Sequence, residues 1–99
     1  MYVIHITVNS DVSEKQRTEM FPFHAEWLQK YFREGKFLIL GPKVNTNAHA
    51  GVILAQSDSI EELYSILNED CFYPDYAQYE IHEFLPKFIS SEIYKFVGQ

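Results

Sequence analysis

His24 and Asp70 are the two residues of this chain whose chemistry points most directly to a function. A histidine beside a carboxylate can accept and return a proton near neutral pH, and the carboxylate fixes the tautomer of the ring and stabilises its protonated form. The two residues are far apart in the sequence. The chemistry therefore depends on a fold that brings them together.

His24 lies in FPFHAEWLQKYF, residues 21–32, which has the spacing of an amphipathic helix. At about 100° per residue, the face that carries the histidine also carries Phe23, Trp27, Leu28, Tyr31 and Phe32. An imidazole on an apolar face needs a hydrogen-bond partner, because an unsatisfied buried polar group costs roughly 1–3 kcal/mol. Asp70 is the candidate partner. From spacing alone, a purely structural histidine is the favoured alternative.

The remaining histidines and the single cysteine suggest less chemistry. His5, His49 and His82 show no ligand spacing typical of a metal site, so we predict none. Proton transfer by a histidine needs no dedicated cofactor, and none is expected. Cys71 follows Asp70, and a neighbouring carboxylate raises the pKa of a thiol. We therefore expect Cys71 to be a small packed residue and not a nucleophile.

The sequence predicts six elements in the order βαββαβ. The expected strands are residues 2–8, 36–43, 51–56 and about 78–84. A helical turn begins at the capping-box serine Ser13 and is expected to kink or break before Pro22, where a longer helix starts and runs to Gly35. A second helix is expected after a cap at Asp58 or Ser59.

This order is that of an α+β, ferredoxin-like domain, expected to span residues 1–99. Right-handed crossovers give a four-stranded antiparallel sheet in the order 4-1-3-2, with both helices on one face. The topology gathers His24, Gly41-Pro42 and Asp70 at one edge of the sheet. The opposite face is bare and partly apolar, which predicts a homodimer through that face. The tail from about residue 86 is expected either to form a short helix after Ser90 or to dock on the partner chain.

The composition excludes several classes of function. The formal charge is −6 with a pI near 5.0, and the eight Lys and Arg residues are scattered, which argues against a nucleic-acid partner. No window reaches the roughly 18 apolar residues of a membrane span. The single cysteine excludes an intrachain disulfide and fits a reducing compartment. We expect a cytoplasmic protein.

Several short motifs together resemble the YCII-related family of the dimeric α+β barrel superfamily, whose fold is similar to that of muconolactone isomerase. The matching segments are Tyr2-Val3-Ile4, Pro22-Phe23-His24, Glu34-Gly35-Lys36, Leu40-Gly41-Pro42, Asp58-Ser59-Ile60-Glu61-Glu62 and Glu69-Asp70-Cys71-Phe72. In that family a histidine on the first helix and an aspartate after the second form an active-site pair. The resemblance implies that His24 and Asp70 are that pair, and that they act as an isomerase, lyase or dehydrochlorinase on a small cyclic or aromatic metabolite.

The chain departs from the family pattern after Asp70. Cys71 stands where the family usually has proline, and Tyr76 or Ala77 where it has a glycine. We expect Tyr73 and Tyr76 to flank the mouth of the pocket and, with Gly41 and Pro42, to contact substrate. The alternative is a non-catalytic dimeric binding or scaffold domain. An open cavity at His24 favours the enzyme, whereas burial of His24 behind the two tyrosines favours the scaffold.

Overall fold

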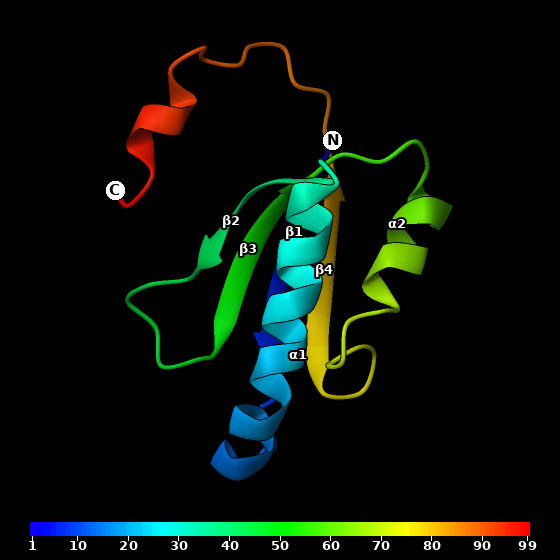
Figure 1. Cartoon of the computed structure of the whole chain (residues 1–99), viewed down its shortest axis with the longest axis vertical. Coiled ribbons are helices and arrows are strands. Elements are labelled where there is room, and N and C mark those ends of the chain that lie inside the picture. The colour runs from blue at the N-terminus through cyan, green and yellow to red at the C-terminus, as the bar shows by residue number, and fades with distance from the viewer.

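The computed structural model describes residues 1–99, and its helices and strands follow the predicted order (Figure 1). The elements are β1 (Tyr2–Val8), α1 (Glu14–Arg33), β2 (Phe37–Pro42), β3 (Ala50–Ala55), α2 (Ile60–Leu67), β4 (Ala77–Glu83) and a final 3₁₀ helix, η1 (Ile93–Phe96). The α+β fold predicted from the sequence is confirmed. No helix has the length and apolar character needed to cross a membrane.

The four strands form one antiparallel sheet in the order β2-β3-β1-β4, which is the predicted arrangement. β1 is central, and Ile4 pairs with Ile53 of β3 on one side and with Ile81 of β4 on the other. Because side chains alternate between the two faces of a strand, Tyr2 and Ile6 point to the same side as Ile4, and all three are buried. This side of the sheet carries the core beneath α1 and α2.

α1 is one continuous helix of 20 residues, so the predicted break before Pro22 is wrong. Ser13 caps the helix, its side-chain oxygen accepting a hydrogen bond from the amide of Gln16 at 3.1 Å. Pro22 removes only the one amide that would bond the carbonyl of Thr18. Helical residues on both sides of the proline pack on the core, which offsets that local loss.

α2 begins at the second of the two predicted caps. Ser59 is the cap, and its hydroxyl oxygen accepts a hydrogen bond from the amide of Glu62 at 3.1 Å. Leu63, Ile66 and Leu67 are buried on one face of the helix. Their burial fixes the end of α2 against the sheet, and Asp70 follows directly after it.

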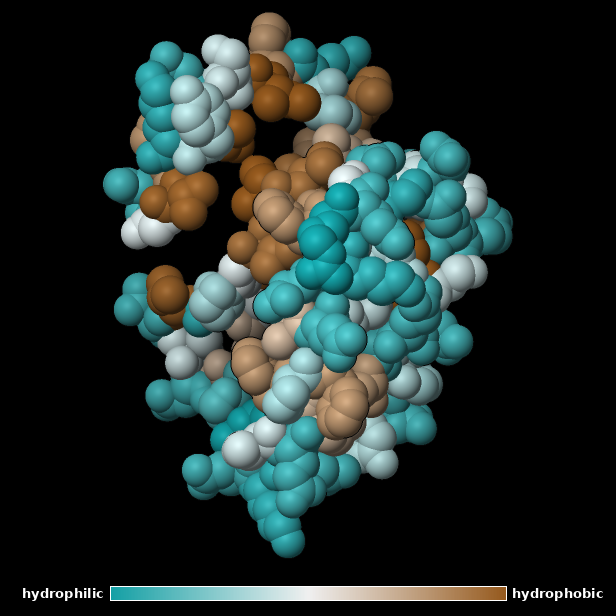
Figure 2. Space-filling model, in the orientation of Figure 1, coloured by the Kyte–Doolittle hydropathy of each residue, from teal (hydrophilic) through white to brown (hydrophobic).

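The chain after β4 forms an arm that leaves the sheet (Figure 1). The amide of Phe84 bonds the carbonyl of Met1, and beyond that point every hydrogen bond of the arm is internal. A short helix does form, as η1, with no buried residue. Hydrophobic side chains gather along the arm (Figure 2). The exposed ones are Phe84, Leu85, Phe88, Ile89, Ile93, Tyr94, Phe96 and Val97. Docking of this arm on a partner stays a prediction.

Candidate functional site

His24 and Asp70 are in direct contact. The Nδ1 atom of His24, on α1, lies 2.8 Å from Oδ1 of Asp70, in the turn that follows α2. The Asp70 side chain is fully buried, and 14% of the His24 side chain is exposed. Ionised Asp70 can only accept, so Nδ1 of His24 is the donor and Nε2 carries the free lone pair. With this tautomer the pair can accept a proton at Nε2, as a general base does.

Tyr79 holds the other oxygen of Asp70. Its hydroxyl donates to Oδ2 of Asp70 at 2.5 Å, and the amide of Phe72 lies 3.5 Å from Oδ1. Burial raises the pKa of Tyr79, and the hydrogen bond to the carboxylate raises it further, so the tyrosine stays a donor. Sequence reasoning missed Tyr79. The alternation along β4 contained the signal, because Tyr79 lies two positions from the buried Ala77 and therefore on the same face.

A row of contacts below His24 fixes α1 against the end of α2. The indole Nε1 of Trp27 donates to the carbonyl of Ile66 at 2.9 Å, in a buried contact. One turn further on, Lys30 bonds Glu69 at 2.9 Å and the hydroxyl of Tyr31 bonds the same carboxylate. These bonds, first that from Tyr31 and then that from Lys30, lower the pKa of Glu69. These contacts fix the position of α1 relative to the end of α2, and therefore the position at which His24 contacts Asp70.

Aromatic rings surround the imidazole of His24. Phe72 lies at 5.2 Å between ring centroids, Trp27 at 5.6 Å and Phe21 at 6.2 Å. Packing on these rings limits how the imidazole can turn, while the Asp70 bond fixes Nδ1. The remaining nitrogen, Nε2, has no hydrogen-bond partner within the chain.

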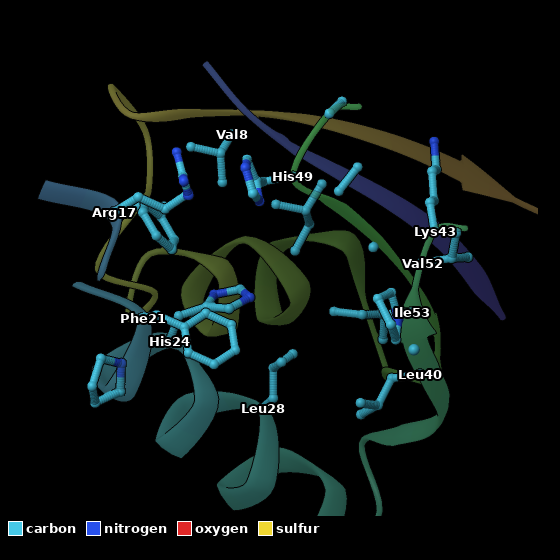
Figure 3. A pocket seen from close by; sticks show the side chains of 18 of the residues that line it. Val8, Arg17, Phe21, His24, Leu28, Leu40, Lys43, His49, Val52 and Ile53 are labelled. Atoms are coloured by element: carbon cyan, nitrogen blue, oxygen red, sulfur yellow. The ribbon is translucent and has the colours of Figure 1, made fainter. Parts of the chain in front are cut away.

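His24 lines a cavity of about 560 Å³ between α1 and the sheet (Figure 3). Its walls are mostly apolar. They include Ile6 and Val8 of β1, Phe21 and Leu28 of α1, Leu40 of β2 and Ile53 of β3. Cavities of this size hold small ring compounds. The cavity is open to solvent.

Gly41 and Pro42 line this cavity, where the sequence placed them. They form the last two residues of β2 and not a turn beyond it. β2 is an edge strand, which tolerates a proline because no further strand needs its amide. Gly51 faces them on β3, and a Cβ at Gly51 would lie 3.1 Å from the carbonyl oxygen of Gly41. A small residue at Gly51 thus lets the two strands form this wall.

Tyr73 and Tyr76 do not line the cavity, contrary to the prediction that they flank its mouth. The ring of Tyr73 packs on Tyr79, with centroids 4.9 Å apart, and the carbonyl of Tyr76 bonds the amide of Asn9. The reason lies in the sheet order. These tyrosines lead into β4, which lies on one side of β1, whereas the cavity lies toward β3 and β2 on the other side.

Cys71 is packed and unreactive in character. Its thiol donates to the carbonyl of Met20 at 3.4 Å. Burial, followed by the charge of Asp70, raises the pKa of the thiol to about 11. The side chain is absent from the cavity wall. The expectation of a packed cysteine agrees with this environment.

Three basic residues that the sequence did not assign to the site also line the cavity: Arg17, Lys43 and His49. Arg17 lies on α1 seven residues before His24, so helical periodicity placed it on the same face. No comparable local signal identified Lys43 or His49. They reach the cavity because β2 and β3 are joined by a loop at its rim. No group of three or more His, Cys, Asp or Glu side chains is placed to hold a metal ion.

The model of the YCII-related domain matches residues 1–85. The chain belongs to this family. Among solved structures it is similar to 5-chloro-2-hydroxyhydroquinone dehydrochlorinase from Burkholderia phenoliruptrix AC1100 in complex with 2,5-dihydroxybenzoquinone, with 15% identity, a TM-score of 0.66 and coverage of 86% of this chain and 94% of that one. It is also similar to muconolactone isomerase, with 22% identity, a TM-score of 0.65 and coverage of 90% and 96%. No curated protein sequence matches the chain.

Proposed function

We propose that this YCII-family chain is an enzyme in which His24 transfers protons to and from a small cyclic or aromatic metabolite. The observation that carries the proposal is the position of the His24–Asp70 pair at an open cavity of about 560 Å³. Tyr73 and Tyr76 do not line that cavity. In a scaffold, both tyrosines were expected to cover His24. The geometry therefore favours the enzyme.

In the proposed reaction, Nε2 of His24 removes a proton from a ring carbon beside a carbonyl group. The C–H electron pair forms a carbon–carbon double bond and the carbonyl becomes an enolate. In an isomerisation, Nε2 returns the proton to a different carbon and the composition of the ring is unchanged. In an elimination, the electrons expel a leaving group as an anion, and the product has lost one proton and that anion.

Asp70 acts in this proposal by positioning His24 and by stabilising the imidazolium that forms when Nε2 accepts the proton. Tyr79 keeps the carboxylate in place through its 2.5 Å bond. The apolar wall lowers the local dielectric constant, which strengthens the interaction between the imidazolium and Asp70. Gly41 and Pro42 shape the wall opposite the helix.

The two structural relatives support the class of substrate. One is a dehydrochlorinase captured with a quinone and the other is an isomerase. Both names describe reactions of small cyclic compounds, and the cavity of this chain is of a size to hold one.

The test uses 5-chloro-2-hydroxyhydroquinone and muconolactone as first substrates, followed by a mixture of cyclic metabolites analysed by mass spectrometry. His24→Gln should slow conversion by about 100-fold or more, because general acid/base catalysis contributes on this scale. His82→Gln is the matched control, since that histidine also bonds a carboxylate but lies away from the cavity. Equal turnover by His24→Gln and the wild type would contradict the proposal.

We further propose that two copies of the chain associate through the apolar half of the open sheet face. The outward residues of this half include Val3, Ile39 and Leu54, by their pairing across β1, β2 and β3. Leu54→Lys places a charge in the middle of this patch and should give a monomer by light scattering, with Gln78→Lys on β4 as the control. A wild-type monomer at micromolar concentration would rule out the dimer.

A further inference from the structure

The cavity at His24 has a positive lining within an acidic protein. The chain has a formal charge of −6, yet no aspartate or glutamate lines the cavity. The charged or titratable residues that line it are Arg17, His24, Lys43 and His49. Such a lining attracts anions and disfavours cations.

Arg17 is free to bind a ligand. Five ion pairs join acidic and basic side chains in the chain, and neither Arg17 nor Lys43 takes part in any of them. A guanidinium offers several N–H donors in a planar fork that fits a carboxylate with two parallel hydrogen bonds. At this cavity the fork has no partner from the protein itself.

Arg17 and His49 stand together at one side of the cavity. Both also line a second hollow, which contains Asn9 and Asp11, and so they lie where the hollow and the cavity adjoin. Figure 3 shows them close to Val8, with His24 lower in the same view. Asp11 lines the second hollow and not the cavity.

The spacing along α1 suits a small ring. Arg17 and His24 are two helical turns apart, which corresponds to a rise of about 10 Å. The apolar residues Phe21 and Pro22 line the wall between them. A planar ring with an acidic substituent at one end can contact the guanidinium there while a ring carbon lies near Nε2 of His24.

We propose that the cavity selects small planar organic anions, with Arg17 binding the carboxylate or other anionic oxygen and His49 donating beside it. This inference rests on the proposed function, since it names the substrate class of the same site. It also adds a role in the reaction, because a guanidinium at the cavity stabilises the negative charge of the enolate that forms there. Lys43 adds positive charge at the rim near β2.

Binding of benzoate and of benzamide tests the proposal, because the two compounds have nearly the same shape and differ in charge. The wild type should bind benzoate about tenfold more tightly than benzamide, as measured by calorimetry or by amide chemical shifts. Arg17→Gln should remove that preference, and Arg17→Lys should keep part of it. The matched control is Lys15→Gln, an exposed cation on the same helix that does not line the cavity.

The inference is overturned by equal binding of the two compounds, by no benzoate binding up to its solubility limit, or by an unchanged preference in Arg17→Gln. Its failure differs from failure of the proposed function. His24→Gln should retain the preference for benzoate while losing turnover. A preference for benzoate together with full turnover by His24→Gln would leave anion binding standing and remove the acid/base role.

Discussion

The chain contains two histidine–carboxylate pairs with almost the same bond length and very different surroundings. His24 lies 2.8 Å from Asp70, and His82 lies 2.9 Å from Glu80. The exposed fractions of the side chains are 14% and 0% in the first pair and 60% and 68% in the second. Distance alone does not distinguish the two pairs. Burial does, because water and salt weaken an exposed pair.

The two pairs also differ in how far apart their members lie in the sequence. His82 and Glu80 are two residues apart on β4, so their contact needs only one strand. His24 and Asp70 are 46 residues apart and meet only when α1 and α2 have packed. Asp70 also accepts a hydrogen bond from Tyr79. The buried pair is therefore part of the tertiary structure, and its loss should disturb the whole fold.

Replacing Asp70 should give the largest effect on stability. Asp70→Ala leaves the imidazole of His24 and the hydroxyl of Tyr79 without a partner in a buried site, which should cost about 3 kcal/mol. Urea denaturation followed by tryptophan fluorescence measures this loss, and Asp70→Asn should lose less because it keeps an acceptor. A loss of unfolding free energy below about 1 kcal/mol would show that the pair contributes no more than an exposed pair does, which would contradict its buried position.

The thiol of Cys71 reports on the environment around the buried pair. With a pKa of about 11, about one thiol in a thousand is ionised at pH 8, whereas an ordinary cysteine is ionised to about one quarter. Alkylation by iodoacetamide should be about 100-fold slower in the folded chain than in the urea-unfolded chain. The rate should rise with pH toward pH 11. Equal rates in the two states would contradict the raised pKa.

The raised pKa of Cys71 also predicts the direction in which stability changes with pH. The pKa of Cys71 is higher in the folded chain than the value of about 8.5 of an unperturbed thiol. The contribution of the neutral thiol is therefore complete below about pH 8.5 and is lost as the pH rises toward about 11.

Tyr79→Phe separates the contribution of the hydroxyl from that of the histidine. The variant removes one donor from Asp70 and leaves the His24 bond in place, so it should cost about 1.5 kcal/mol. Urea denaturation of Tyr79→Phe, Asp70→Ala and the double variant gives the interaction free energy between the two residues. Additive losses would mean that the hydroxyl and the carboxylate do not act together.

Glu80→Ala should have the smallest effect. Both members of its pair are mostly exposed, and pairs of this kind contribute little to stability. The hydrogen bond from His82 lowers the pKa of Glu80, and high salt should weaken that interaction. We expect the variant and the wild type to have the same urea midpoint at each of two protein concentrations. A loss that depends on protein concentration would instead place this pair in a contact between copies.

Several features of the fold followed from local chemistry. Alternating apolar residues defined β1, serine caps marked the starts of α1 and α2, and periodicity turned His24 inward. The βαββαβ order then limited the topology to one in which His24 and Asp70 come to the same edge. These features depend on near neighbours in the sequence or on chain connectivity, and both can be derived without coordinates.

Other features depended on packing between distant segments. Local rules predicted a break at Pro22, but tertiary burial of α1 keeps the helix continuous. Tyr73 and Tyr76 were expected at the pocket because they follow Asp70, yet the course of β4 carries them to the other side of β1. Lys43 and His49 come to the cavity from the loop between β2 and β3.

The sequence by itself determined the elements, their order and the inward direction of His24, because propensity, capping and periodicity act over a few residues. Only the tertiary structure decided that Tyr79 bonds Asp70 and that a cavity with a basic lining forms beside His24. The physical reason is that a cavity and a buried hydrogen-bond network are defined by distances between segments remote in the chain, and no local pattern encodes those distances.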